Sequence, residues 1–384
     1  MAEKTIKVAL LRKMTNLEND DRIRKEVETL GKLFSNIAIK CFVMYPDNKE
    51  YEGVTSYGLH FKSVFVKGRD QYASGKRLFA KAWDYYRAIK KDIKEYDVIW
   101  CSGDAPTPSL LFIHGKKIIW DLRELPLFLV GSRLKHIILK HIFKKCDVCL
   151  HANQFRINYL ASLGLINDQS KHIPIRNFPD FSTIDSEYDE RYHEVKEWIA
   201  GRKCIYLQGI NAPSRASNES LTAVMETPGI CAIVLGSMDE DAFASLKAKY
   251  GEEQVLSRIC VAGNFPVLKV PQYMKLCYAS MVFYKNTSPN NWYCEANRLY
   301  QAIDMGLPVV VGANPPMKAT VEELGVGISV DTDGSDADMI VRGLATLLEN
   351  YDKFKSNIDK LKDEIKWDTQ SVSIKKAFES LLNH

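Results

Sequence analysis

Short apolar runs alternate with amphipathic stretches along most of the 384-residue chain. The apolar runs predict buried strands, and stretches whose apolar residues recur at spacings of three and four predict helices. Strands that alternate with helices are typical of parallel sheets covered on both faces. The first half is predicted to hold strands at Lys7–Leu11, Ala38–Met44, Val98–Cys101, Lys117–Asp121, Val148–Ala152 and Ile173–Ile175, with helices at Asp21–Phe34, Gly75–Lys94 and Leu134–Lys145.

The same alternation occurs again in the second half. Its predicted strands are Cys204–Leu207, Cys231–Leu235, Arg258–Val261, Met281–Phe283, Pro308–Val311 and Ile328–Val330. Its predicted helices are Asn218–Glu226, Asp241–Tyr250, Val270–Leu276, Asn297–Met305 and Met339–Asn350. The chain then ends in a helical stretch, Asp352–Leu382, that is interrupted around Trp367–Thr369.

Because the alternation runs twice, and because single cores usually stop growing at roughly 250–300 residues, we expect an α/β protein with two doubly wound, Rossmann-like domains. Two such domains bring the carboxyl ends of two sheets to a cleft, where ligands bind. The expected parts are a first domain over 1–180, a linker over 181–200, a second domain over 201–366, and a C-terminal helix over 367–384 that packs back on the first domain.

The composition is that of a globular protein, with 46% hydrophobic and 26% charged residues, and it excludes collagen-like, disordered and disulfide-scaffold classes. The net charge of +4 conceals a division. Residues 1–180 hold 31 Lys and Arg against 20 Asp and Glu, whereas residues 181–384 hold 21 against 28. A basic half joined to an acidic half indicates that the two halves meet different partners.

Several protein classes are excluded by what the sequence lacks. No signal-peptide pattern occurs at the N-terminus, and no apolar run approaches the roughly 18 residues that cross a bilayer. Nine cysteines without framework spacing indicate reduced thiols in a cytoplasmic protein, and we expect Cys146 and Cys149 to lie in the core on opposite faces of a strand. Neither a dinucleotide-binding glycine pattern after the first strand nor a P-loop is present.

The segment Asn291–Gly312 carries the most chemical information. Asn297 or Glu295 opens a predicted helix there, and Arg298 lies in its first turn. A helix N-terminus presents unpaired N–H groups and a positive dipole, so this arrangement suits a diphosphate. Gln301 lies one turn further on the same face and is placed to bind a ribose hydroxyl. The alternative is a surface helix with incidental polar residues.

A second segment, Ile205–Leu221, has a similar character. A strand ends there at Gly209, and Arg215 follows in the turn before the next helix, which Ser217 or Asn218 is expected to cap. Arginine at such a position suits anionic oxygens. The alternative is a loop arginine in solvent.

These segments resemble a family. The stretch Asn297–Val310, NRLYQAIDMGLPVV, is similar to the family pattern PNKLFEYMAAGLPVV, and Ser214–Ala216 matches the basic position after the first strand of the second domain. In the first half, the resembling segments are Asp20–Leu30, Ile119–Leu125 and Ile173–Asp180. The family is the retaining, nucleotide-sugar-dependent glycosyltransferases of the GT-B fold, the glycosyltransferase-4-like group 1 enzymes.

The resemblance implies transfer of a sugar from a nucleoside diphosphate donor to a hydroxyl, with retention of configuration and without a required metal or other cofactor. The implied donor-binding residues are Gly209, Arg215, Asn297, Arg298, Leu299 and Gln301. The implied catalytic residues are Arg215, Arg298, Glu295, Asp121 and Arg123, and Asn16, Asp21 and Arg22 are implied on the acceptor side.

The chain departs from the family pattern at four positions. Tyr293 and Gln301 stand where the family has acidic residues, Ile210 replaces an arginine, and Arg123 replaces a histidine. Two other functions therefore stay open: a nucleotide-sugar epimerase of the same architecture, and a non-catalytic scaffold that binds nucleotide sugars. Asp331–Asp333 and Asp239–Asp241 look like metal-binding D-x-D pairs, but we expect both to lie in acidic loops distant from the motifs.

The basic first half contains a segment that is suited to an anionic membrane, where a lipid-linked acceptor would lie. Ser132–Lys145 carries five Lys or Arg and no acid, with Leu134, Ile137, Ile138 and Ile142 at helical spacing. Basic amphipathic helices of this type lie on anionic membrane surfaces, which suits a lipid-linked or glycan acceptor in cell-surface polysaccharide or glycolipid synthesis. We therefore expect a cytoplasmic protein that is peripheral on the inner face of the membrane. The basic half contains no recognised nucleic-acid-binding module, so we expect no nucleic-acid partner.

Overall fold

The computed structural model describes residues 5–13, 16–68, 77–184, 188, 190–361 and 363–382, and it divides into two compact units. Unit 1 comprises the described residues up to Arg176 and those from Gln370 onward, and unit 2 runs from Asn177 to Thr369. The chain thus leaves unit 1 once and returns to it for its last helix. The first two residues of the helix expected from Gly75, like Met1–Lys4 at the N-terminus, lie outside the described residues.

Unit 1 is built on an eight-stranded sheet with the order β3-β4-β2-β1-β5-β6-β7-β8. All neighbouring strands are parallel except β3 and β4, which form an antiparallel hairpin at one edge. The strands are β1 (Ile6–Lys13), β2 (Ile37–Met44), β3 (Tyr51–Val54), β4 (His60–Ser63), β5 (Val98–Ser102), β6 (Lys117–Leu122), β7 (Val148–His151) and β8 (His172–Pro174).

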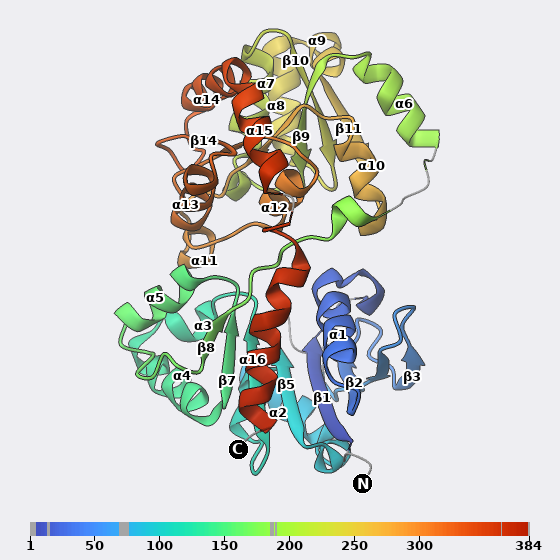
Figure 1. The fold of residues 1–384 in the computed structure, drawn as a ribbon, viewed down its shortest axis with the longest axis vertical. Helices are drawn as coiled ribbons and strands as arrows, with labels where there is room; N and C mark the ends of the chain where they lie inside the picture. Colours follow the sequence, from blue (N-terminus) through green and yellow to red (C-terminus); the bar gives the residue numbers. More distant parts are fainter. Residues whose placement is uncertain are drawn as a thin grey trace. The chain divides into compact units, whose positions relative to one another are not determined.

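Helices cover the sheet of unit 1 (Figure 1). The α-helices are α1 (Asp21–Leu33), α2 (Leu78–Ile89), α3 (Leu127–Val130), α4 (Arg133–Lys145), α5 (Gln154–Ser162) and α16 (Ser371–Leu382), and the short 3₁₀ turns are η1 (Leu17–Asn19), η3 (Asp92–Glu95) and η4 (Thr107–Leu111). The ring of Phe378 on α16 lies 5.9 Å from Trp100 on β5 and 6.2 Å from Phe34 after α1. Aromatic packing thus holds the last helix on unit 1.

Unit 2 contains a six-stranded sheet with the order β11-β10-β9-β12-β13-β14, in which all neighbours are parallel. The strands are β9 (Lys203–Gln208), β10 (Ile230–Leu235), β11 (Ile259–Gly263), β12 (Ala279–Val282), β13 (Val309–Val311) and β14 (Gly327–Ser329). The α-helices are α6 (Glu190–Ile199), α7 (Ser217–Glu226), α8 (Glu240–Tyr250), α9 (Glu252–Arg258), α10 (Val270–Met274), α11 (Pro289–Trp292), α12 (Asn297–Asp304), α13 (Pro315–Leu324), α14 (Ala337–Glu349) and α15 (Tyr351–Lys360). The 3₁₀ turns are η5 (Phe181–Thr183), η6 (Pro213–Arg215), η7 (Val267–Lys269) and η8 (Trp367–Gln370).

The strands of unit 2 are buried on both faces. Cys204 and Tyr206 of β9 belong to one apolar core. Ile205 and Leu207, which alternate with them along the strand, belong to another core on the opposite face. Consecutive strand residues point to opposite sides, so a strand covered on both sides must be apolar throughout. This explains why uninterrupted apolar runs in the sequence predicted these strands.

The stretch 181–200 is not the linker that was expected. Its helix α6 packs into the core of unit 2 through Tyr192, Val195 and Ile199. The remaining residues of α6 are mostly exposed and charged, which makes the segment weakly apolar on average. The chain crosses between units at Arg176 and Thr369, whereas 180 and 366 were expected. Residues 185–187 and 189 lie outside the described part.

Cys146 and Cys149 are both buried and form no disulfide. Cys146 caps the end of α4, however, and β7 begins only at Val148, so the expectation that both lie in one strand was wrong. Burial and the neighbouring Cys149 thiol raise the pKa of Cys146, which keeps its thiol protonated. Among the described residues, no helix is long and apolar enough to cross a membrane.

Candidate functional site

Two arginines of unit 2 meet at the carboxyl end of β9. Arg215 Nη1 donates to the Gly209 carbonyl oxygen at 2.8 Å, and Arg298 Nη1 donates to the preceding carbonyl, that of Gln208. Both guanidinium groups also lie against the ring of Tyr284, 5.5 Å and 5.0 Å from its centroid. Residues 83 positions apart in the sequence are thereby brought to one edge of the sheet, where ligands of doubly wound domains bind.

Two helices begin beside these arginines without a side-chain cap. The N-cap residues are Ala216 for α7 and Ala296 for α12, and neither helix has a side-chain cap hydrogen bond. The expected cap at Ser217 or Asn218 was therefore wrong, and Ser217 Oγ instead donates to Asp239 Oδ2 at 2.7 Å. Uncapped helix N-termini beside two cations suit a diphosphate, which brings its own acceptors.

Gly209 is required where β9 turns toward η6. Its φ of +56° is one that L side chains rarely adopt, and a Cβ there would lie 3.1 Å from Arg215 Nη1. The glycine thus allows the Arg215 side chain to fold back on the strand end. Arg298 is also enclosed: its side chain is buried, and Nε has no hydrogen-bond partner within the described part of the chain.

The other predicted donor-side residues occupy different environments. Asn297 is exposed at the start of α12, and Gln301 is half-buried one turn later. Leu299 is completely buried in the core of unit 2, so its side chain packs rather than binds a ligand. Glu295 Oε1 accepts from the hydroxyls of Tyr300 at 2.5 Å and Thr320 at 3.4 Å, which orients this carboxylate toward those two hydroxyls.

In unit 1, the predicted catalytic residues Asp121 and Arg123 belong to a buried ionic cluster at the carboxyl end of the sheet. Asp121 is fully buried and accepts from Arg22 Nη2 at 3.3 Å, Arg123 Nε at 3.3 Å and Ser102 Oγ at 3.0 Å. Arg123 Nη1 also donates to both oxygens of Asp20 at 2.9 Å. The side chain of Asp121 thus has three partners within unit 1.

Arg22, predicted on the acceptor side, is the second arginine of this cluster. Besides Asp121, it contacts Glu26 Oε1 at 2.8 Å and the Ile175 carbonyl oxygen at 3.0 Å, and it is buried. Burial raises the pKa of Glu26, while the nearby arginines oppose that rise. Of the other acceptor-side predictions, Asn16 caps η1 and Asp21 pairs with Lys25 at 2.8 Å.

Asp20 makes the stability of unit 1 sensitive to acid. Burial acts to raise its pKa, but Arg123 and Arg12 outweigh burial and lower the pKa to about 2. Because the unfolded value is about 3.9, Asp20 stabilises the fold above that pH, and this contribution is lost as the pH falls toward the folded value. We expect the difference in unfolding free energy between the wild type and Asp20→Asn to narrow as the pH falls from about 5 to about 3. Urea titrations across that range measure it, and a constant difference contradicts the assignment.

The sequence analysis missed Asp104, which follows β5 and so lies, like Asp121, at the carboxyl end of the unit 1 sheet. Burial, reinforced by Glu124, raises the pKa of Asp104 to about 7. A carboxyl group with such a pKa can exchange protons near neutral pH, which is a property of general bases. The signal was present in the sequence, because Gly103-Asp104 directly follows an apolar strand just as Gly209 follows β9.

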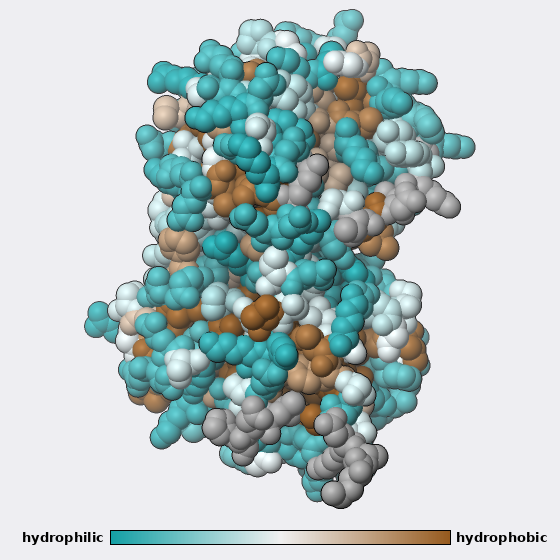
Figure 2. All heavy atoms as spheres, in the orientation of Figure 1, coloured by the Kyte–Doolittle hydropathy of each residue, from teal (hydrophilic) through white to brown (hydrophobic). Residues whose placement is uncertain are grey.

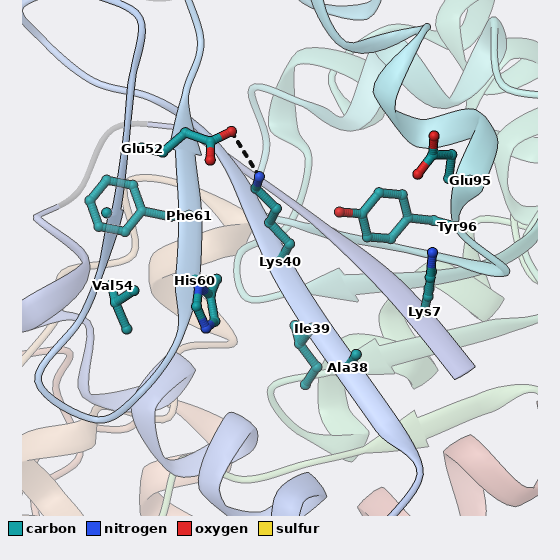
Figure 3. A pocket seen from close by; sticks show the side chains of 11 residues that line it. Lys7, Ala38, Ile39, Lys40, Glu52, Val54, His60, Phe61, Glu95 and Tyr96 are labelled. Carbon is teal, nitrogen blue, oxygen red and sulfur yellow. Dashed lines mark hydrogen bonds and ion pairs between the residues drawn. The ribbon is translucent and has the colours of Figure 1, made fainter. Parts of the chain in front are cut away.

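A pocket on unit 1 lies toward the amino ends of β1 and β2, between these strands, the β3–β4 hairpin and Tyr96 (Figure 3). Its volume is about 500 Å³, and its charged groups include Lys7, Lys40, Glu52 and Glu95. Lys40 and Glu52 pair with each other at 2.9 Å. The balanced charges favour no class of ligand, and doubly wound sheets bind ligands at the opposite end.

No group of three His, Cys, Asp or Glu side chains with metal-binding geometry is found among the described residues. In the D-x-D pairs, Asp239 accepts from Ser217 Oγ and Ala242 N, and Asp333 accepts from Asn286 N. Ser217 begins α7 directly after Arg215 and Ala216, so the expectation that the Asp239 pair lies far from the motifs was wrong.

No family model matches the chain, and no curated protein matches its sequence. Solved structures match the fold over nearly its whole length. The sucrose-phosphate synthase of Thermosynechococcus elongatus has a TM-score of 0.77 at 12% identity, with 98% of this chain and 99% of that chain covered. The chain has the GT-B fold.

Two further GT-B glycosyltransferases show the same likeness. Trehalose-6-phosphate synthase OtsA has a TM-score of 0.73 at 11% identity, with 99% of each chain covered. HepE of Anabaena, solved in complex with UDP-glucose, has a TM-score of 0.69 at 12% identity, with 97% of this chain and 99% of that chain covered. Both units of this chain thus correspond to parts of complete GT-B structures.

Proposed function

We propose that the protein is a glycosyltransferase that moves a sugar from a nucleoside diphosphate donor to an acceptor hydroxyl, with retention of configuration. The convergence of Arg215 and Arg298 at the end of β9, beside two uncapped helices, carries the proposal. The likeness to GT-B structures, among them HepE with UDP-glucose, supports it. The motif around Arg298 resembles that of retaining enzymes.

In this reaction the bond between the anomeric carbon and the diphosphate oxygen breaks, and a bond to the acceptor oxygen forms. The diphosphate leaves with added negative charge, and the acceptor hydroxyl passes its proton to the departing diphosphate oxygen. Arg215, Arg298 and the start of α12 stabilise that charge, because preorganised cations and N–H groups are most effective where charge develops. In this proposal Gln301, which lies one turn along α12, binds the ribose, and no step calls for a metal.

Donor binding is tested by thermal unfolding in the presence of a panel of nucleoside diphosphates and their sugars. A ligand that binds only the folded state raises its apparent stability. We expect one base to be preferred, with the nucleoside diphosphate alone giving a substantial part of the shift. If no member of the panel shifts the transition, the donor site is wrongly assigned.

We further propose that the acceptor is lipid-linked, in polysaccharide or glycolipid synthesis, and that α4 holds unit 1 on an anionic membrane. Leu134 and Ile137 on α4 are 83% and 71% exposed, although the face seen in Figure 2 is largely hydrophilic. Arg133, Lys135, Lys140 and Lys144 on the same helix are exposed too, and the helix has no acidic residue. Exposed apolar side chains within a basic surface are typical of interfacial helices. Lys145 is excluded from this surface, since it donates to the carbonyl oxygens of Leu110 and Leu111.

The double variant Leu134→Gln, Ile137→Gln should bind vesicles of phosphatidylglycerol and phosphatidylcholine about tenfold more weakly, or worse, because burying each apolar side chain contributes roughly 1.5–3 kcal/mol. Vesicle sedimentation measures the change. Val372→Gln is the matched control, because Val372 is 72% exposed on α16 of the same unit. Equal binding by the double variant and the control contradicts the membrane assignment.

A further inference from the structure

A second pocket of unit 1 has a more selective lining. It lies between η1, the residues that follow β2, and the β3–β4 hairpin, and its volume is about 540 Å³. Small-molecule sites span roughly 300–1,000 Å³. Asn16–Glu18 and Tyr45–Asp47 follow the carboxyl ends of β1 and β2, where ligands of doubly wound sheets bind.

Three aromatic rings form one wall of this pocket. Tyr45 and Tyr51 stack with centroids 5.9 Å apart and planes 6° apart, and Phe61 meets them edge-on at 5.8 Å and 6.1 Å. Gly53 makes room for this cluster, because a Cβ there would lie only 2.7 Å from Phe61 Cζ. Tyr51 lines the pocket and is 41% exposed.

Hydrogen bonds join η1 to the turn of the β3–β4 hairpin and to Tyr45, and they hold the pocket in shape. Glu18 accepts from the backbone N–H of Ser56 at 2.9 Å and from its hydroxyl at 2.7 Å. Tyr57 donates its hydroxyl to the Leu17 carbonyl oxygen at 2.8 Å, and the Tyr45 hydroxyl accepts from Leu17 N at 3.4 Å. A preformed wall of this kind lowers the entropy cost of binding.

The charge of the lining selects the class of ligand. Among the described residues that line the pocket, the ionisable groups other than tyrosines are Glu18 and Asp47, and neither Lys nor Arg is present. Two carboxylates repel phosphate and other anions, which excludes the donor diphosphate from this pocket. Carboxylates and the Asn16 amide can bind hydroxyl groups, while aromatic faces pack against the C–H faces of sugar rings.

We propose that this pocket binds an uncharged saccharide unit of the acceptor. The inference rests on the proposed function, in which unit 1 receives the acceptor. It specifies which residues bind the acceptor and which class of ligand they bind. The sugar ring would pack on Tyr51, and Asp47 and Asn16 would bind its hydroxyls. The acceptor would then be an already glycosylated molecule rather than a bare lipid phosphate.

Saturation-transfer NMR with maltotetraose, cellotetraose, mannotetraose and galactotetraose tests the proposal on the full-length protein. We expect at least one saccharide to bind, Tyr51→Ala to weaken it about fivefold or more, and Tyr51→Phe to retain most of the affinity, since ring contacts contribute about 1 kcal/mol or more. Phe65→Ala is the matched control, because Phe65 is an exposed aromatic residue of unit 1 outside the pocket.

Three results overturn the proposal: no saccharide binds, the saccharide binds Tyr51→Ala as well as the wild type, or tetramethylammonium binds in place of saccharides. The donor panel is run on the same samples. If donors raise the unfolding temperature as expected but Tyr51→Ala does not weaken saccharide binding, the saccharide pocket is rejected and the proposed function stands. If neither donors nor saccharides bind, both the pocket and the proposed function are rejected.

Discussion

Arg298→Ala should weaken donor binding and turnover about tenfold to a hundredfold, and Arg215→Ala should have an effect of the same order. A hydrogen bond to a charged group contributes about 1.5–3 kcal/mol, and each variant removes one cation from the diphosphate site. Calorimetric titration with the nucleoside diphosphate that gives the largest thermal shift measures the loss. Arg298→Lys should recover part of it, because lysine keeps the charge but lacks the planar fork.

Arg202→Ala is the matched control for both variants. Arg202 is held like Arg298, by backbone carbonyl oxygens and an aromatic ring, since it donates to Ser257 O at 2.7 Å and lies 4.5 Å from the Trp198 ring. It precedes β9, however, and so lies at the amino end of the strand. Donor affinity should be unchanged in Arg202→Ala, and equal losses in all three variants would indicate a general effect on folding instead of a donor site.

Arg22→Ala should lower the free energy of unfolding of unit 1 by about 3–5 kcal/mol, because it leaves Asp121 and Glu26 buried without one of their cations. The side chains of those carboxylates are 0% and 1% exposed, so water cannot replace the guanidinium. Urea unfolding followed by the fluorescence of buried Trp100 and Trp120 measures the change.

Arg24→Ala is the control on the same helix. Arg24 pairs with Asp21 and Glu28, but it is less buried than Arg22, with 19% of its side chain exposed against 6% for Arg22. Such pairs typically contribute less than about 1 kcal/mol. Similar losses in Arg22→Ala and Arg24→Ala would show that the cluster does not carry the stability of unit 1.

The sequence was most informative where local pattern and burial coincide. Strands β9 and β10 are apolar on both faces, so their bounds were predicted to within one residue. The hairpin of β3 and β4 was missed, because each strand has only four residues, because polar residues interrupt His60–Ser63, and because Tyr51–Val54 is the edge strand of the sheet. That hairpin carries two of the three aromatic rings in the wall of the proposed saccharide pocket, Tyr51 and Phe61.

The candidate site was predictable in part. The chain motifs placed Arg215 and Arg298 near helix starts, and their shared contact with Tyr284 came only from the structure. The direction of a side chain is set by packing, which is why Leu299 was expected at the donor and lies in the core. The partners of Asp121 are up to 99 residues away in sequence, so no local pattern could indicate that ionic cluster.

The central claim is that the protein transfers a sugar from a nucleoside diphosphate donor. The most direct test incubates the protein with radiolabelled donor, anionic vesicles and a polyprenyl-phosphate-linked glycan, and then quantifies nucleoside diphosphate and labelled lipid together. We predict that both products form in equal amounts and that both fall sharply in Arg298→Ala. A donor whose sugar changes without release of nucleoside diphosphate would identify an epimerase, and donor binding with neither product would identify a scaffold; either result contradicts the account.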